Sequence, residues 1–136
     1  MIIQKTLLIV ILLLGIQLGQ LQAQRIQNNQ RTTIGYIENK RIKDNQRTTI
    51  GYIEDNKVKT NLGTTVLYID DMKIKDRLNR TIGYVENNSI KNHLGQTLGY
   101  IYDNRVTDNL RTTIWYYNNI DRIQLAVYWF FWKNND

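Results

Sequence analysis

The chain carries an internal repeat with a spacing of 16 residues, and this repeat restricts the possible folds more than any other feature of the sequence. Each copy contains a threonine, then an aliphatic residue, and a tyrosine two positions after the aliphatic residue. A repeat of this length forms one small structural unit, which buries its apolar residues against neighbouring copies. We therefore expect a repeat assembly in which no single unit is stable alone. The tyrosine recurs in six copies, at Tyr36, Tyr52, Tyr68, Tyr84, Tyr100 and Tyr116.

Each copy has the sequence pattern of a β-hairpin. In the first full copy, a β-rich run at residues 33–38 (TIGYIE) is followed by Asn39 and Lys40 and by a second run at residues 41–44 (RIKD). The corresponding turn positions in later copies are rich in Asn and Asp, which tolerate positive φ angles and suit two-residue hairpin turns. Because such a turn fixes the register of its two strands, the pairing of every hairpin can be predicted.

The predicted register places residues of one kind on each face of the hairpin. Ile37 lies opposite Ile42 on one face, and Tyr36 lies opposite Lys43 on the other, where the ring covers the lysine stem. A slip of one residue would break all such pairs together. In later copies the register pairs Ile53 with Val58, Ile69 with Ile74, Val85 with Ile90, Ile101 with Val106, Tyr52 with Lys59, Tyr68 with Lys75 and Tyr84 with Lys91.

Apolar residues on both faces need a neighbour on both sides, because a lone hairpin is marginal in water. The fold class that we expect is all-β: a ring or propeller-like assembly of short β-hairpins with approximately five-fold order. A six-fold ring and an open solenoid are the alternatives. A half unit at residues 25–33 precedes the first full copy. Pairing this half unit with the last unit would bury exposed strand edges.

Glycine recurs inside the first strand of four copies. Because glycine weakens a strand and usually marks the close approach of another backbone, we expect strands that converge around a central axis. Leu67 and Trp115 hold this position in the other two copies. The glycines are Gly35, Gly51, Gly83 and Gly99.

The N-terminal segment has the features of a secretory signal peptide. Lys5 precedes an apolar run at residues 6–14, and Ala23 offers a small residue for cleavage. The alternative is an uncleaved membrane anchor, but the apolar run is shorter than the roughly 20 residues that a spanning helix needs. We predict a signal peptide at residues 1–23 and a repeat domain at residues 24–136. The expected location is secreted, periplasmic or at the cell envelope, with no stable membrane span after cleavage.

An aromatic segment at residues 125–132 (LAVYWFFW) follows the last copy. The segment is too short to span a bilayer as a helix. We expect a closing strand or a plug that is buried against the ring. The alternative is an exposed segment that binds a partner or touches a membrane. Its candidate contact residues are Tyr128, Trp129, Phe130, Phe131 and Trp132.

Residues that build most catalytic and metal sites are scarce. The chain has no cysteine, one histidine, His93, and one serine, Ser89, so the usual zinc and nucleophile arrangements cannot be assembled. Carboxylates such as Glu54 recur in phase beside the turns, where ion pairing and solvent explain them, whereas an active site normally breaks a repeat. We therefore predict no enzyme activity, catalytic residue, metal or cofactor, with a hydrolase as a remote alternative.

The recurring tyrosine–lysine pairs form a candidate ligand-binding belt. In a ring, these aromatic and cationic side chains would hold sugars or polyanions through stacking and charge. The alternative is packing between hairpins with solvated lysines. Without residues 1–23 the net charge is +5, a modest value that argues against a nucleic-acid partner for an exported protein. The belt consists of Tyr36, Tyr52, Tyr68, Tyr84, Tyr100, Lys43, Lys59, Lys75 and Lys91.

The motifs TIGYIE at 49–54, TIGYVE at 81–86 and TLGYI at 97–101, with the tail LAVYWFF at 125–131, resemble the five-fold β-flower protein family. The resemblance covers nearly the whole chain after residue 23. It implies a small ring of short hairpins with approximate five-fold symmetry, in exported bacterial proteins. It brings no catalytic residue with it.

These observations lead us to expect an exported, non-catalytic β-repeat protein with a structural or binding role at the cell envelope or outside the cell. The alternative is a glycan- or polyanion-binding module that uses the belt. The expected partners are polysaccharide or another envelope protein.

Overall fold

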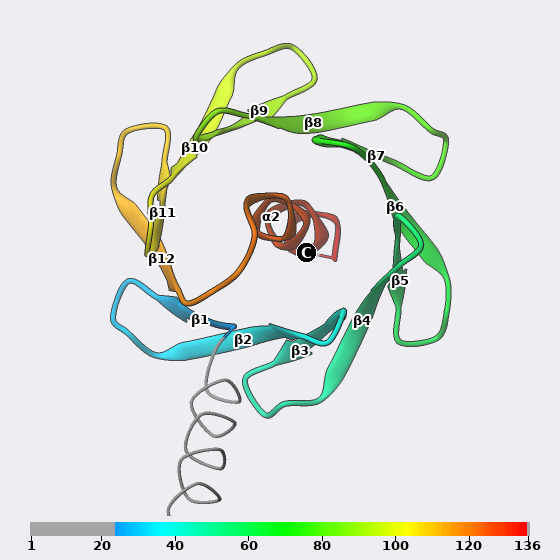
Figure 1. Cartoon of the computed structure of the whole chain (residues 1–136), viewed down its shortest axis with the longest axis horizontal. Helices are drawn as coiled ribbons and strands as arrows, with labels where there is room; N and C mark the ends of the chain where they lie inside the picture. Colours follow the sequence, from blue (N-terminus) through cyan, green and yellow to red (C-terminus); the bar gives the residue numbers. More distant parts are fainter. Residues whose placement is uncertain (1–23, 136) are drawn as a thin grey trace, which may run out of the picture.

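The computed structural model describes residues 24–135, so the predicted signal peptide at residues 1–23 lies outside the described residues. This part of the chain forms short strands and one helix, α2 (Arg122–Asn135) (Figure 1). The strands are β1 (Arg25–Asn28), β2 (Thr33–Glu38), β3 (Arg41–Asp44), β4 (Thr49–Glu54), β5 (Lys57–Thr60), β6 (Thr65–Asp70), β7 (Lys73–Lys75), β8 (Thr81–Glu86), β9 (Ser89–Asn92), β10 (Thr97–Ile101), β11 (Arg105–Asp108) and β12 (Thr113–Tyr117).

The strands β1 to β12 form one closed barrel in which every neighbouring pair is antiparallel. Five hairpins follow one another along the chain, from β2–β3 to β10–β11, and β12 pairs with β1, with Gln27 opposite Tyr116. The predicted pairing of the first half unit with the last unit is therefore confirmed. The open solenoid is wrong, because pairing β12 with β1 leaves no free edge. The wall is also one continuous sheet and not a set of separate propeller blades.

The predicted register is confirmed in the five hairpins. Tyr36 lies opposite Lys43 and Ile37 lies opposite Ile42 in β2–β3, and the corresponding predicted pairs recur in the other four. The turn residues Asn39 and Lys40 have φ angles of 50° and 63°, as a two-residue hairpin turn requires. The isoleucine and valine pairs face the inside of the barrel, and the tyrosines and lysines lie on the outer wall.

Where one hairpin meets the next, the pairing is irregular at an equivalent place. The register shifts between Ile42 and Lys43 where β3 pairs with β4, and similar shifts recur between the other hairpins and between β1 and β2. A β-bulge bends its strand and increases the local twist. These shifts therefore help short strands to curve into a narrow ring, with the connecting loops turned away from the axis (Figure 1).

Alternate connections lie at opposite ends of the barrel, because neighbouring strands are antiparallel. The turn end carries the two-residue hairpin turns and residues 118–121, which lead into α2. The loop end carries the longer loops that join β1 to β2, β3 to β4, β5 to β6, β7 to β8, β9 to β10 and β11 to β12, and these loops extend outwards around the ring (Figure 1).

A side chain at the start of each loop holds that loop in place. The Asp44 carboxylate accepts hydrogen bonds from the backbone N–H groups of Gln46 and Thr48, both at 2.9 Å. Local bonds of this kind substitute for backbone pairing and fix the course of a loop. The side chains of Asn28, Asp76, Asn92 and Asp108 make the same two bonds in their own loops.

After β12 the chain turns into the barrel and forms α2, which lies inside the ring (Figure 1). Asp121 caps this helix: its N–H donates to the Gln124 side-chain oxygen at 3.4 Å, and its carbonyl accepts from the Leu125 N–H at 3.0 Å. Ile120 and Leu125, on either side of the cap, are both buried. This combination of a capping box and a hydrophobic staple starts a helix and sets the direction in which it leaves the wall.

The expectation that the aromatic segment forms a closing strand is wrong, because residues 125–132 are helical and fill the barrel as a plug. The barrel already closes through β12 and β1, so a further strand would find no unpaired edge. A segment inside the barrel must satisfy its own backbone hydrogen bonds, and a helix does so within itself. Within residues 24–135, no helix has the length and apolar character needed to cross a membrane.

Four consecutive aromatic residues of α2 point at four different glycines of the wall. A Cβ atom at Gly35 would lie 2.8 Å from the Tyr128 hydroxyl and 2.8 Å from the carbonyl oxygen of Lys43. Consecutive helix residues point about 100° apart, so four of them reach around the whole ring. The other pairs are Gly99 with Trp129 at 3.1 Å, Gly83 with Phe130, and Gly51 with Phe131 at 3.0 Å.

The expected cause of the glycine repeat therefore needs a correction. The wall strands do not converge on one another around an axis. What approaches each glycine is a ring of α2 together with the carbonyl of the adjacent strand. The two copies without glycine also serve the core: Leu67 is completely buried, and Trp115 packs edge-on against Tyr128, with the ring centroids 5.1 Å apart.

Candidate binding surfaces

The outer wall carries a row of half-buried tyrosines, each set between two neighbouring strands. Tyr52 lies opposite Lys59 on one side and opposite Arg41 on the other. Because each hairpin occupies two strand spacings, successive tyrosines are about 10 Å apart around the wall. The same arrangement places Tyr36 between Lys43 and Arg25, Tyr68 between Lys75 and Lys57, and Tyr84 between Lys91 and Lys73.

The structure brings the predicted belt residues together over four hairpins. In the fifth hairpin neither residue opposite the tyrosine is charged. The four tyrosine–lysine pairs lie side by side along the outer wall. Tyr100 lies in the same row, but its neighbours are Thr107 and Ser89, which carry no charge. Tyr100 is therefore at the edge of the belt.

Loop arginines cover some of these rings and leave others open. Arg47 lies over Tyr36 with its guanidinium carbon 4.1 Å from the ring centroid. Gly63 takes the place of this arginine in the loop that follows Tyr52, and Asn79 and Gly95 take it in the next two loops. Equivalent coverage recurs for Arg111 over Tyr100 at 4.2 Å and, across the closure of the barrel, for Arg31 over Tyr116 at 3.7 Å. In the described part of the chain, no loop arginine covers Tyr52, Tyr68 or Tyr84, although Arg41 of the neighbouring strand lies 6.0 Å from the centroid of the Tyr52 ring, so these three rings are the more open part of the belt.

The belt lysines differ in their ion-pair partners. Lys75 lies 3.1 Å from Asp70 and Lys91 lies 3.1 Å from Glu86, while Lys43 lies 3.6 Å from Glu38. The pairs of Lys75 and Lys91 have an exposed carboxylate and therefore exchange easily with another anion, whereas Lys43 and Glu38 are both partly buried. Within residues 24–135, no carboxylate lies within ion-pair distance of Lys59. Lys59 is consequently the belt lysine that is most available to an external anion.

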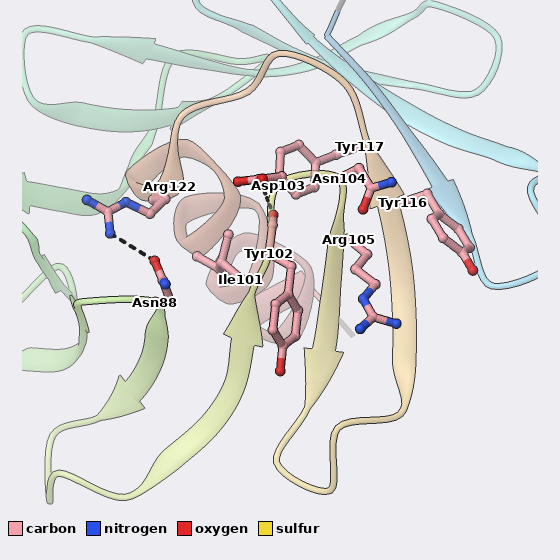
Figure 2. Close-up of a pocket in the computed structure, with 9 residues that line it drawn as sticks. All are labelled: Asn88, Ile101, Tyr102, Asp103, Asn104, Arg105, Tyr116, Tyr117 and Arg122. Atoms are coloured by element: carbon pink, nitrogen blue, oxygen red, sulfur yellow. Dashed lines mark hydrogen bonds between the residues drawn. The ribbon is translucent and has the colours of Figure 1, made fainter.

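A second surface lies at the turn end, where the β10–β11 turn, β12 and the start of α2 surround a cleft of about 740 Å³ (Figure 2). Phenol, guanidinium, amide and carboxylate groups face this turn-end cleft. They suit it to stacking and hydrogen bonding with a polar ligand. Its lining residues are Asn88, Ile101, Tyr102, Asp103, Asn104, Arg105, Tyr116, Tyr117 and Arg122.

Specific contacts hold the walls of the turn-end cleft together. The Tyr117 hydroxyl donates a hydrogen bond to the carbonyl of Tyr102. Arg122, at the start of α2, donates to the side-chain oxygen of Asn88 at 3.3 Å. Burial raises the pKa of Tyr117, the nearby carboxylate of Asp103 raises it further, and Arg122 opposes both effects. Tyr117 therefore acts as a neutral donor that fixes the β10–β11 turn.

The turn-end cleft was not predicted from the sequence, although the repeat contains a signal for it. Tyr102 occupies the position at which the earlier copies have an acidic residue, and Tyr117 occupies the position of the inward isoleucine. Departures from a repeat mark places with a separate role. Here the departures gather where the barrel closes and α2 begins.

The aromatic segment is placed apart from both surfaces. Tyr128 is 0% exposed, and Trp129, Phe130 and Phe131 are also buried against the wall, while Trp132 is half-buried. Burial raises the pKa of Tyr128 to about 12, with a hydrogen-bond contribution from Trp132 in the opposite direction. His93 is exposed in its loop. In residues 24–135, no group of three or more histidine and acidic side chains is arranged to hold a metal ion.

Comparison with known proteins agrees with the architecture. The sequence matches the family described as 5-fold beta-flower protein over residues 23–133. Comparisons with curated proteins and with solved structures gave no match. The matched segment includes all twelve described strands and nearly all of α2. The resemblance seen in the repeat motifs and the aromatic tail is thereby confirmed, and the chain belongs to the 5-fold beta-flower family.

Proposed function

We propose that this protein is an exported, non-catalytic barrel that binds anionic polysaccharide, or another extended polyanion, on its outer wall at the cell envelope or outside the cell. One observation carries the proposal. Tyr52, Tyr68 and Tyr84 each lie between cations on both neighbouring strands, and none has an arginine at the loop position that covers Tyr36.

The filled interior supports a binding role for the outside of the barrel. Leu125, Val127 and Tyr128 are fully buried in the space that ligand-carrying barrels leave for a small molecule. A ligand therefore has the outer wall and the two ends available. The outer wall offers the more extended of these surfaces.

The chemistry of the belt suits a long anionic chain. Each ring offers an apolar face to a sugar, and the cations on either side attract carboxylate or sulfate groups. The spacing of about 10 Å between rings spreads these contacts over several sugar units. A compact ligand would reach only one of them.

The test is titration of the purified protein with polygalacturonate and dextran sulfate, with neutral dextran for comparison. We expect saturable binding of the anionic polymers that weakens as salt is added, because screening reduces the attraction between the charges. Tyr52→Ala removes the ring on which a sugar would stack. Binding should weaken about tenfold, which is the size of effect expected for the loss of one aromatic contact. Lys59→Gln should weaken binding and reduce its dependence on salt.

Tyr116→Ala is the matched control. Tyr116 lies in the same row, opposite Gln27 on one side and Arg105 on the other, and Arg31 covers its ring, so its removal should weaken binding less than the removal of Tyr52. Circular dichroism would show that each variant keeps its strands. The proposal fails if no anionic polymer binds, or if Tyr52→Ala and Tyr116→Ala have equal effects.

Export is part of the same proposal and rests on the sequence of residues 1–23. Expression with this segment should deliver a protein that begins near Gln24 to the periplasm or the medium, as N-terminal sequencing would show. Removal of residues 2–23 should leave the protein in the cytoplasm.

The number of units in the ring is also part of the proposal. We take the 16-residue unit as the building block of the wall. Five consecutive hairpins and the β12–β1 pair then make six units, in place of the approximately five-fold order that we expected. The cation–π contact between Arg31 and Tyr116 supports this count, because it repeats, across the β12–β1 junction, the contact between Arg47 and Tyr36.

A further inference from the structure

Four loops at the loop end of the barrel carry a leucine that points into solvent. The exposed fractions are 88% for Leu62, 72% for Leu78, 70% for Leu94 and 80% for Leu110. A single exposed leucine is common on protein surfaces and needs no explanation. Four at the same position of four successive loops form a pattern, and each leaves an apolar side chain in water.

The loops do not need leucine in order to fold. Gln30 and Gln46 hold the same position in the first two loops. Those loops have the same side-chain hydrogen bonds, in which the Asn28 and Asp44 oxygens each accept from two backbone N–H groups. The loop backbone is therefore stable with a polar tip. The fold of the loops therefore gives no internal reason for the leucines.

The leucines share one end of the barrel but do not form one apolar patch. All of these loops lie at the loop end, because they join antiparallel strands at alternate connections. Figure 1 shows the loops spread around the ring, each separated from the next. A partner protein with a shaped groove would need continuous contact area. Separate apolar tips suit a fluid apolar phase, into which each one inserts independently.

The charges beside the leucines are suited to an anionic surface. The loops carry five arginines, Arg31, Arg47, Arg77, Arg80 and Arg111, against the three carboxylates of Asp44, Asp76 and Asp108, which is a net charge of +2. Arg80 pairs with Asp76 at 2.8 Å and Arg47 pairs with Glu38 at 3.0 Å, while Arg31, Arg47 and Arg111 lie over tyrosine rings and keep their charge.

A hollow of about 440 Å³ lies beside one of the leucine tips. Leu67, Leu78 and Phe131 line this hollow together with Asp76, Arg77 and Arg80, and Arg80 pairs with Asp76 at 2.8 Å. Apolar side chains next to the guanidinium group of Arg77 match the boundary between the phosphates and the acyl chains of a lipid.

We propose that the loop end docks onto the surface of an anionic phospholipid bilayer. The leucine tips enter the boundary between headgroups and acyl chains, and the loop arginines contact phosphates. The rigid loops present the tips without a loss of loop entropy on binding. The leucine tips lie outside the tyrosine–lysine belt, although Arg47 and Arg111 also lie over the belt rings of Tyr36 and Tyr100.

The test is co-sedimentation of the full mature protein with vesicles of phosphatidylcholine alone and of phosphatidylcholine with phosphatidylglycerol. We expect stronger binding to the anionic vesicles, with partial release by salt. Each of L62Q, L78Q, L94Q and L110Q should lower the partition coefficient about five- to tenfold, since each removes one inserted side chain. The quadruple variant should not bind detectably.

A matched variant should change vesicle binding in the opposite direction. Q46L gives the second loop the tip that the later loops have, and it should raise the partition coefficient by a similar factor. Because glutamine is native at this tip in two loops, the substitutions in both directions should leave the circular dichroism spectrum unchanged. The quadruple variant should still bind polyanions through the belt, and Lys59→Gln should still bind vesicles.

Two results would overturn the proposal. One is equal vesicle binding by the wild-type protein and the quadruple variant, which would leave the leucines without a role at the membrane. The other is an absence of vesicle binding, with light scattering showing a wild-type dimer that the quadruple variant converts to a monomer. That second result would assign the loop end to self-association.

Discussion

Tyr128 is the largest side chain that is fully buried in the described barrel. It places one hydroxyl group in a core that otherwise consists mainly of hydrocarbon. Burial raises the pKa of this hydroxyl to about 12, with the Trp132 side chain opposing the shift. The phenolate is thus disfavoured in the folded state. Together with Tyr117, whose pKa burial also raises, this hydroxyl makes the stability of the core sensitive to alkaline pH.

The direction of this sensitivity follows from the two pKa values. In the unfolded chain the phenol loses its proton near pH 10, whereas in the folded protein it keeps the proton until about pH 12. The stability that the neutral phenol provides is therefore complete below pH 10 and is lost as the pH rises to 12. The loss amounts to about 2 kcal/mol. Urea unfolding between pH 8 and pH 12 measures it.

Tyr128→Phe separates this effect from the titration of the other tyrosines and lysines. The variant lacks the group, so its free energy of unfolding should fall less over the same pH range. Parallel pH profiles for the variant and the wild-type protein would contradict the assignment to Tyr128.

The helix α2 fits inside the barrel because glycines in the wall leave room for its aromatic rings. The wall has glycine at four places where an aromatic ring of α2 arrives, and it has Leu67 and Trp115 at the other two equivalent positions. Glycine disfavours strands. The wall therefore gives up some strand stability at these positions, and the close packing of the buried rings offsets that loss.

Gly35→Ala tests this fit between elements. The added methyl group would lie 2.8 Å from both the Tyr128 hydroxyl and the Lys43 carbonyl, and overpacking of this kind costs about 1–3 kcal/mol. Adding Tyr128→Phe removes one of the two clashes and should recover part of the loss. In Gly51→Ala, where Phe131 is the neighbour, Tyr128→Phe should give no recovery. Equal effects of Tyr128→Phe in the two backgrounds, measured by thermal unfolding, would contradict the pairing.

The strands were predictable and the helix was not, for a local physical reason. The turn residues fix the register of each hairpin, so Tyr36 opposite Lys43 follows from the sequence alone. The aromatic segment has strong β propensity, which points away from a helix. The signals for α2 lie before that segment, in Asp121 with Gln124 and in Ile120 with Leu125. The turn-end cleft was missed because Tyr102 and Tyr117 come together only where the β10–β11 turn meets β12 and the start of α2.

The barrel as a whole depends on the segment that fills it. The inward residues of the wall, such as Ile42, Val58 and Ile74, are fully buried together with α2. A chain that stops at Asn119 retains the strands but exposes this inner surface. We expect it to lack cooperative thermal unfolding. A peptide of residues 120–135 added to it should restore cooperativity, whereas a sharp transition without the peptide would show that the wall is stable alone.

The order of the elements along the chain sets when the native structure can form. Ile26, in the first strand, finds its partner Tyr117 only after all the hairpins between them have been made. The core rings of α2 follow later still. Contacts this distant in sequence slow folding. The filled barrel can therefore form only after β12 and α2 have been synthesised.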